Sequence, residues 1–301
     1  RDGDPPDAWL DDLRRALPEA QVDVWRPGLP PGYDHAVVWN VPQQLFDEQP
    51  QLRAVVNLAA GVDKLLDLRL PPALAIVRLE DAGMAVQMAE YACHALIRFF
   101  REFDAYADQQ RAGHWAPRRP RARADFPVGI MGLGALGARV AQAVRQFDFP
   151  VLGWSRTRHA LDGVRCFADE AELGAFLQAT RVLVCLLPLT DATRGLLNQG
   201  TLGQLQPGGY LINVARGALL VEDDLRHLLD TGHLAGAALD VMAQEPLPAD
   251  HWLWTHPRVA LTPHVGAQTM RGESVAQVAQ ALRAIERGEA PVGLVRRDRD
   301  Y

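Results

Sequence analysis

Cysteine is scarce in this sequence. Only Cys93, Cys166 and Cys185 occur among 301 residues, and they form no CxxC pair. Their odd number and wide spacing exclude a disulfide framework and the common cysteine-based metal sites. The histidines show no metal-ligand spacing either. We therefore expect a protein without a metal, located in a reducing compartment, the cytoplasm.

Long apolar runs and an excess of positive charge are also lacking. No apolar stretch reaches the length of about 18 residues that is needed to cross a bilayer, and no signal peptide is visible. Lys and Arg number 31 against 37 Asp and Glu, which gives a formal net charge of −6, whereas nucleic-acid-binding domains are usually basic. We expect neither a membrane nor a nucleic acid as a partner. The net charge does not select a substrate, because a basic pocket can occur on an acidic protein.

The composition is that of a globular protein with an ample core: 48% of residues are hydrophobic and 23% are charged. The length favours one large or two medium domains. Residues 8–17 predict an amphipathic helix and residues 22–25, 35–39 and 52–58 predict strands, an alternation typical of a parallel sheet. Because such a unit usually opens on a strand, we expect a first strand before Arg1.

The rest of the chain shows the same alternation more clearly. Residues 80–110 predict one long helix, and the Arg- and Pro-rich residues 111–126 predict a loop or an arm for subunit contacts. Further strands are expected at 128–131, 151–154, 182–187, 210–214, 237–241 and 259–262. Further helices are expected at 136–147, 170–179, 222–231 and 274–287. Residues 127–264 are therefore typical of one complete dinucleotide-binding domain.

A glycine-rich loop lies between the strand at 128–131 and the helix that follows it. Its sequence, GLGALG, matches G-x-G-x-x-G in the strand–turn–helix context that the motif requires. Gly132 permits a tight turn, Gly134 lets the backbone approach a pyrophosphate, and Gly137 lets the helix pack closely on its strand. The helix N-terminus then offers free N–H groups to the phosphates. The alternative is a glycine-rich turn without a ligand.

The segment Ser155-Arg156-Thr157-Arg158 follows the next predicted strand. An NAD enzyme normally has Asp or Glu here to bind the ribose 2′-hydroxyl, and that carboxylate is absent. Ser155, Arg156 and Arg158 could instead bind a 2′-phosphate through charge-assisted hydrogen bonds. The segment therefore favours NADPH, with NADH as the weaker cofactor. The alternative is a solvated basic turn.

Three polar residues follow predicted strands nearer the C-terminus: Arg216, Glu245 and His264. The carboxyl ends of strands in an open α/β sheet are where ligands bind, so we expect these side chains to form a catalytic set. Taken singly, Arg216 and Glu245 could be a structural ion pair, and His264 a satisfied core histidine.

With these motifs in view, the chain resembles the D-isomer-specific 2-hydroxyacid dehydrogenase family, and within it the bacterial glyoxylate/hydroxypyruvate reductases of the A type. The resemblance spans essentially the whole sequence. It is carried by the strings VWN, AAGVDK, RLEDAGM, GIMGLGALG, WSRTR, NVARGALLVEDDL, LDVMAQEPLP and LTPHVGA.

The resemblance implies a role for each catalytic residue. Arg216 would bind the substrate carboxylate and the carbonyl oxygen, because a planar guanidinium is suited to such a two-point contact. His264 would be the general acid in the reductive direction, and Glu245 would hydrogen-bond its other ring nitrogen and favour the imidazolium. Trp39 would wall the substrate pocket, and the backbone of Ala60 and Gly61 would bind the substrate carboxylate.

The resemblance also implies the cofactor contacts and the fold. Asp240 is at the position of the contact to the nicotinamide carboxamide. The full implied set is Gly132, Gly134, Ala135, Leu136, Gly137, Ser155, Arg156, Thr157, Arg158, Leu187, Pro188, Ala215 and Asp240. The fold would be α/β with two Rossmann-like domains around an interdomain cleft that closes before hydride transfer. A flavodoxin-like substrate domain would comprise residues 1–92 and 270–301, and an NAD(P)-binding Rossmann domain residues 93–269.

The expected reaction is NADPH-dependent reduction of glyoxylate to glycolate and of hydroxypyruvate to D-glycerate by a homodimer. Trp115, in the Arg- and Pro-rich arm, would reach a partner subunit's active site or anchor the dimer interface. One alternative keeps the chemistry and takes a bulkier 2-oxo acid, although Trp39 and the small residues 59–61 favour a small polar substrate. The other alternative is a cofactor-sensing protein without turnover, which the complete set of Arg216, Glu245 and His264 disfavours.

Overall fold

The computed structural model describes residues 6–296, and the chain divides into two compact units. The first comprises Arg1–Met84 and Thr269–Tyr301, and the second comprises Ala85–Gln268. Both contain parallel sheets with helices on their faces, which confirms the predicted α/β class. No helix among the described residues is both long enough and apolar enough to span a membrane.

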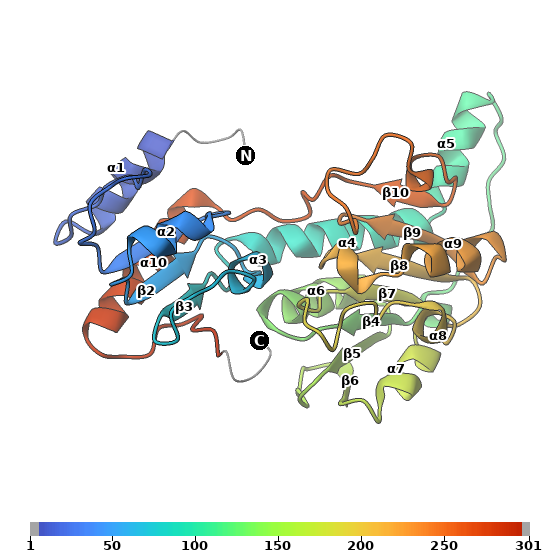
Figure 1. Ribbon diagram of the computed structural model, residues 1–301. Helices are drawn as coiled ribbons and strands as arrows, with labels where there is room; N and C mark the ends of the chain where they lie inside the picture. The colour runs from blue at the N-terminus through green and yellow to red at the C-terminus, as the bar shows by residue number, and fades with distance from the viewer. Residues whose placement is uncertain (1–5, 297–301) are drawn as a thin grey trace. The chain divides into compact units, whose positions relative to one another are not determined.

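The described part of the first unit holds a parallel sheet in the order β1-β2-β3. Its strands are β1 (His35–Val38), β2 (Ala54–Asn57) and β3 (Ala75–Arg78). Helices α1 (Pro6–Ala16) and α10 (Arg271–Glu286) pack against each other (Figure 1). The remaining helices of this unit are α2 (Gln43–Glu48) and α3 (Asp63–Leu66).

Side-chain alternation along these strands builds two core layers. Val56 and Val77 belong to the cluster that contains α1 and α10, whereas Val55 and Ile76 belong to the cluster that contains α2 and α3. Successive residues of a strand point to opposite faces, so an unbroken apolar run is buried on both sides. The outer edge of β3 is covered by a short antiparallel bridge between Val77 and Leu294.

The second unit, all of whose residues are described, holds a parallel sheet in the order β10-β9-β8-β7-β4-β5-β6. The strands are β4 (Val128–Met131), β5 (Val151–Ser155), β6 (Val164–Ala168), β7 (Val182–Cys185), β8 (Gly209–Asn213), β9 (Leu234–Leu239) and β10 (Val259–Leu261). Strand order reverses between β4 and β7, and such a switch point is where doubly wound sheets bind ligands.

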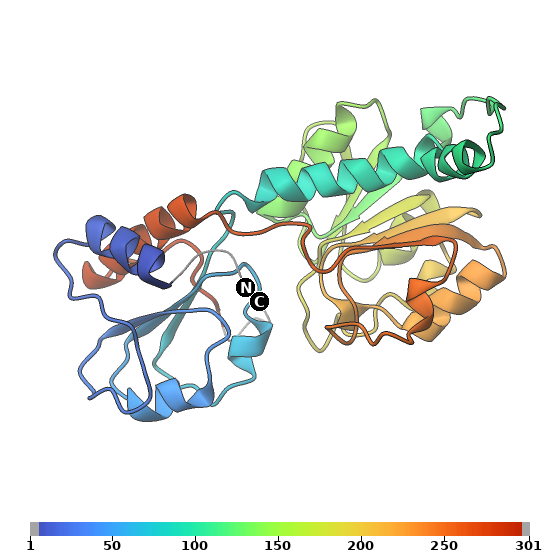
Figure 2. The same ribbon diagram turned by 90° about the horizontal axis from the view of Figure 1, so that it is seen from above.

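Helices cover both faces of this second sheet. Helices α4 (Met84–Phe100) and α6 (Ala135–Arg145) contribute to the core cluster of one face, and Figure 2 shows α4 running along that unit. The other face carries α7 (Leu173–Ala179), α8 (Gln199–Leu202) and α9 (Glu222–Asp230). The remaining elements are α5 (Phe103–Arg111) and the 3₁₀ turns η1 (Arg123–Asp125), η2 (Gly217–Leu219) and η3 (Trp252–Trp254).

Some predicted elements are wrong. The expected single helix at 80–110 is two helices, because Glu102 takes a left-handed conformation with φ 55° between α4 and α5. Its carboxylate binds both Arg118 and Arg121 at 2.7 Å, which fixes the bend. Residues 22–25 form no strand, and the Arg14 guanidinium donates a hydrogen bond to the Val22 carbonyl at 3.0 Å.

Two strands were missed. β3 is a run of only four residues, and β6, at an edge of its sheet, buries only its last two residues. Short runs of this kind carry little periodicity, so their pairing partners decide their structure.

We predict that Phe176→Ala lowers the free energy of unfolding by about 3–5 kcal/mol, because it opens a cavity in a rigid core. Phe176 is fully buried and contacts Phe167 edge-on at 5.8 Å between ring centroids. Urea titration followed by circular dichroism measures the change. Phe147→Ala is the matched control, since Phe147 is 40% exposed. Equal losses in the two variants would contradict this assignment of the core.

Candidate active site

The glycine loop joins β4 to α6 at the switch point of the second sheet. Gly132 has φ 105°, which other residues rarely adopt. A Cβ on Gly137 would overlap the carbonyl oxygen of Gly132, so the helix could not pack so closely with any larger residue. At Gly134, which precedes the first helical residue, a Cβ would meet nothing within 4 Å. The loop is therefore closely packed beneath and open at the position predicted to face a pyrophosphate.

The start of α6 is suited to hold an anion. No side chain caps this helix, which begins at Ala135, so its first N–H groups and the positive end of its dipole are available to a ligand. Leu187 and Pro188 follow the neighbouring strand β7 at the same edge of the sheet, Leu187 buried and Pro188 half-buried. These residues fit a dinucleotide placed across the carboxyl ends of β4 and β7.

The basic segment after β5 divides into two parts. Ser155 is buried, and its hydroxyl donates a hydrogen bond to the Thr157 carbonyl at 2.7 Å, which folds the turn; Arg156 is exposed. Arg158, in contrast, binds Glu172 at 2.6 Å and donates to the Cys166 carbonyl at 3.2 Å. The pKa of Glu172 is held below its usual value by a hydrogen bond from the Ala168 amide and then by Arg158. Arg158 thus ties the turn to α7.

The three predicted catalytic residues follow neighbouring strands whose ends are in register. Asn213, Leu239 and Leu261 are paired across β8, β9 and β10, and each is the last residue of its strand. Arg216, Glu245 and His264 lie on the loops that leave these three residues. The parallel register therefore starts all three loops at one edge of the sheet.

His264 and Glu245 are in direct contact. His264 Nδ1 lies 2.8 Å from Glu245 Oε2, and the side chains are 34% and 36% exposed. The other carboxylate oxygen accepts a hydrogen bond from the Met242 amide at 3.1 Å, so Glu245 is held at both oxygens. Because Nδ1 faces the carboxylate, Nε2 is the nitrogen that would exchange a proton with a substrate.

Arg216 is half-buried on the loop after β8, and its loop is fixed by Asn213. The buried Asn213 amide donates to the Arg216 carbonyl and accepts from the Ala215 amide, each at 3.2 Å. A Cβ on Gly217 would overlap the Met242 carbonyl group, so glycine lets the Arg216 loop pack on the loop of Glu245. The Arg216 loop is therefore held by the Asn213 side chain and by close backbone packing on the loop of Glu245.

The turn that carries His264 is anchored by Asp240. This carboxylate is 2% exposed and accepts hydrogen bonds from the Val265 and Gly266 amides, each at 2.8 Å, and from the Thr262 hydroxyl at 2.6 Å. Thr262 is in turn 2.7 Å from the Tyr91 hydroxyl of α4. Sequence reasoning missed Thr262 and Tyr91. Thr262 lies within the string LTPHVGA, whereas Tyr91 carries no signal beyond its place in a helix.

Glu222 was missed as well. Its carboxylate accepts a hydrogen bond from the Ala243 amide at 3.0 Å and lies 3.3 Å from His251. It therefore supports the loop of Glu245 from the start of α9. The string NVARGALLVEDDL contains this residue, but nothing in the sequence connects it with Ala243.

The predicted substrate residues of the first unit lie on loops after β1 and β2. Trp39 directly follows β1 and is 42% exposed. The buried Asn57 amide donates to the carbonyls of Ala59 at 3.4 Å and Gly61 at 2.8 Å, which shapes the loop containing Ala60. Their contact with a substrate stays a prediction.

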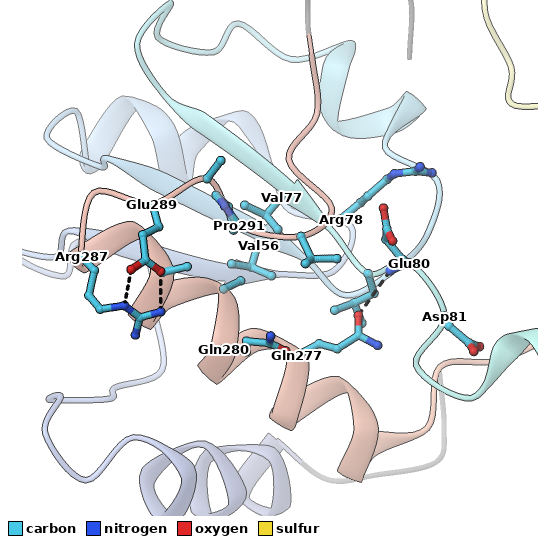
Figure 3. A pocket seen from close by; sticks show the side chains of 15 residues that line it. Val56, Val77, Arg78, Glu80, Asp81, Gln277, Gln280, Arg287, Glu289 and Pro291 are labelled. Carbon is cyan, nitrogen blue, oxygen red and sulfur yellow. Dashed lines mark hydrogen bonds and ion pairs between the residues drawn. The ribbon is translucent and has the colours of Figure 1, made fainter. Parts of the chain in front are cut away.

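A cavity of about 420 Å³ lies elsewhere in the first unit, between β3 and α10 (Figure 3). Apolar side chains such as Val56, Val77 and Ala281 line it, and Arg287 and Glu289 pair at its rim at 2.7 Å. None of the predicted site residues lines it. Among the described residues, no group of three or more His, Cys, Asp or Glu side chains is arranged to hold a metal ion.

Comparison with known proteins agrees with this architecture. The family model described as "D-isomer specific 2-hydroxyacid dehydrogenase, NAD binding domain" matches residues 93–266. A D-isomer specific 2-hydroxyacid dehydrogenase from Xanthobacter autotrophicus Py2, solved with NADPH and MES, is 37% identical over 100% of this chain and 98% of its own, with a TM-score of 0.94.

Two further structures are similar. The NADPH-dependent glyoxylate/hydroxypyruvate reductase of Sinorhizobium meliloti, solved with NADP and sulfate, is 33% identical over 97% of this chain and 96% of its own, with a TM-score of 0.87. A D-isomer specific 2-hydroxyacid dehydrogenase family protein from Klebsiella pneumoniae 342 is 36% identical over 97% and 95%, with a TM-score of 0.83. With a family match over more than half of its length and these identities over nearly all of it, the chain belongs to the D-isomer specific 2-hydroxyacid dehydrogenase family and is an oxidoreductase of the CH–OH group.

Proposed function

We propose that this protein reduces small 2-oxo acids with NADPH, converting glyoxylate to glycolate and hydroxypyruvate to D-glycerate. The observation that carries the proposal is the 2.8 Å contact of His264 with Glu245. The loop of Glu245 also packs against the loop of Arg216. His264 would supply the acid, Glu245 would stabilise its positive charge, and Arg216 would supply a cation that binds the substrate. The second unit would bind the cofactor, and Trp39, Ala60 and Gly61 of the first unit would bind the substrate.

The proton step follows from the arrangement of His264. Protonated His264 would donate its Nε2 proton to the carbonyl oxygen of the substrate, while Glu245 accepts the hydrogen bond from Nδ1–H and stabilises the imidazolium. Arg216 would bind the substrate carboxylate and draw charge onto the carbonyl oxygen. The nicotinamide cofactor supplies the hydride to the carbonyl carbon.

NADPH is supported by the residues around the glycine loop. The open space at Gly134 and the uncapped start of α6 suit a pyrophosphate. Arg156, exposed beside Ser155, would bind the 2′-phosphate, and no carboxylate is present in this turn to repel it. The similar proteins from X. autotrophicus and S. meliloti were solved with NADPH and NADP.

The small substrate is supported by the similarity to the S. meliloti glyoxylate/hydroxypyruvate reductase and by the small residues at 59–61.

The decisive assay follows NADPH absorbance with glyoxylate, hydroxypyruvate, pyruvate and phenylpyruvate. Fastest oxidation with the first two acids supports the proposal. A preference for phenylpyruvate would assign a bulkier substrate, and no oxidation with any acid would indicate a binding protein.

We also propose a cytoplasmic homodimer. The three cysteines are free thiols, and burial raises the pKa of Cys93 to about 11 and that of Cys185 to about 12, so both stay protonated. The arm at 111–126 is held at its base by Glu102, which binds Arg118 and Arg121, while its Trp115 is 96% exposed. Tryptophan is enriched at protein–protein interfaces, so an exposed indole on a fixed arm suits contact with a second copy of the chain.

We predict that His264→Gln lowers kcat by about 10²–10⁴-fold, because the proton donor is lost. The affinity for NADPH should change little, since the glycine loop and Arg156 are untouched. Stopped-flow absorbance measures the first quantity and fluorescence titration the second. His256→Gln is the matched control, because His256 also faces a carboxylate, Asp230, at 3.3 Å. Unchanged turnover in His264→Gln would refute the role of general acid.

We predict that Arg156→Ala raises KM for NADPH by about 10–100-fold, which corresponds to one lost charge-assisted hydrogen bond of about 1.5–3 kcal/mol. KM for NADH should stay the same, because NADH lacks the 2′-phosphate. Arg158→Ala should have a smaller effect, since Arg158 is already paired with Glu172. Steady-state kinetics with both cofactors decide this; an equal cofactor preference in wild type and Arg156→Ala would contradict it.

We predict that the purified protein has twice the 33.1 kDa mass of one chain. Light scattering coupled to gel filtration measures it. Trp115→Ala should shift the equilibrium toward the monomer on dilution, whereas Trp254→Ala, at a tryptophan that is 54% exposed, should not. A monomer at every concentration would rule out the homodimer.

A further inference from the structure

The side chain of Asp240 closes the turn that carries His264. Its Oδ1 accepts hydrogen bonds from the Thr262 hydroxyl at 2.6 Å and the Val265 amide at 2.8 Å, and its Oδ2 accepts one from the Gly266 amide at 2.8 Å. These donors flank His264 on both sides in the sequence. Since the carboxylate is 2% exposed, water cannot readily replace them.

The backbone of His264 needs such support. His264 has φ 55°, a left-handed conformation that costs free energy in a residue with a side chain. Its amide donates to the Asp240 carbonyl at 2.8 Å. A Cβ on Gly266 would lie 2.8 Å from Asp240 Oδ2, so glycine permits the close approach of the carboxylate. Asp240 thus contacts the turn through both its carbonyl and its carboxylate.

The hydrogen bonds give this network a direction. A carboxylate only accepts, so the single proton of the Thr262 hydroxyl goes to Asp240. The hydrogen bond of 2.7 Å between Thr262 Oγ1 and the Tyr91 hydroxyl is therefore donated by Tyr91. Burial is the main cause that raises the pKa of Tyr91, so its hydroxyl keeps its proton at neutral pH. Tyr91 thus orients the Thr262 hydroxyl toward Asp240.

We propose that Tyr91 is a positioning residue of the reaction: acting through Thr262 and Asp240, it holds the turn of His264 so that the imidazole stays aligned for proton transfer. This inference rests on the proposed function, because it assigns a purpose to the proton donor of that reaction. It places a determinant of catalysis on α4, a helix that contributes no residue to the predicted catalytic set. Asp240 would serve this anchor in addition to its predicted contact with the cofactor.

Four single variants test the network. Tyr91→Phe removes one hydroxyl, Thr262→Val removes the link at nearly constant volume, and Thr262→Ser keeps the hydroxyl. Tyr33→Phe is the matched control, because the Tyr33 hydroxyl also donates one hydrogen bond, to Asp23 at 2.7 Å. We expect Tyr91→Phe to lower kcat about tenfold with KM for NADPH within about twofold, because a misplaced catalytic group costs rate rather than cofactor affinity.

The threonine variants should show that Tyr91 acts through Thr262. Thr262→Val should lower kcat more than Tyr91→Phe does. Adding Tyr91→Phe to Thr262→Val should change kcat no further, because the effects of mutations within one hydrogen-bond network are not additive. Thr262→Ser should restore most of the wild-type kcat. Additive losses in the double variant would overturn the proposal.

Hydrogen–deuterium exchange of the Val265 and Gly266 amides gives a readout that needs no turnover. It should accelerate about tenfold in Tyr91→Phe, as expected when a local anchor loosens, and not in Tyr33→Phe. If either kcat or exchange in Tyr91→Phe stays at the level of the control, the proposal is overturned. If the wild type oxidises NADPH with none of the four acids, the proposed function fails. Tyr91 then has no catalytic role, even where hydrogen–deuterium exchange shows that it anchors the turn.

Discussion

The site depends on the register of β8, β9 and β10. Because Asn213, Leu239 and Leu261 are paired in adjacent parallel strands, the three loops that follow begin side by side. A shift of one residue would turn every side chain to the opposite face of the sheet, and the closely packed, buried side chains of β8 and β9 oppose such a shift. The chemistry can then be assembled from residues that lie tens of positions apart in the sequence.

Above that edge, the loops are held by backbone groups and buried polar side chains. Asn213 fixes the Arg216 loop, Asp240 fixes the His264 turn, and Gly217 allows two of the loops to pack backbone to backbone. Small and buried polar residues are suited to this task because they leave no flexible side chain between the loops. The partly exposed side chains of the site can then act on a ligand while their backbones stay in place.

Much of this could be read from the sequence, for physical reasons. The glycine loop has a local signature because Gly132 and Gly137 each meet a steric demand within a few residues. The buried strands of the second unit were predictable because continuous apolar runs are buried on both faces. The bend at Glu102 was not, because it depends on Arg118 and Arg121, which follow it by 16 and 19 residues. The link from Tyr91 to Thr262 joins residues 171 positions apart, and no local pattern reports such a contact.

The ion pair of Arg158 with Glu172 separates two tasks that the sequence alone cannot distinguish. The segment Ser155–Arg158 is polar throughout, yet Arg158 is bound to Glu172 at the start of α7 and so belongs to the scaffold. Under the proposed function, a substitution at position 156 would change the affinity for NADPH while the Arg158–Glu172 pair stays in place. Cofactor choice and the stability of the turn could then change separately during evolution.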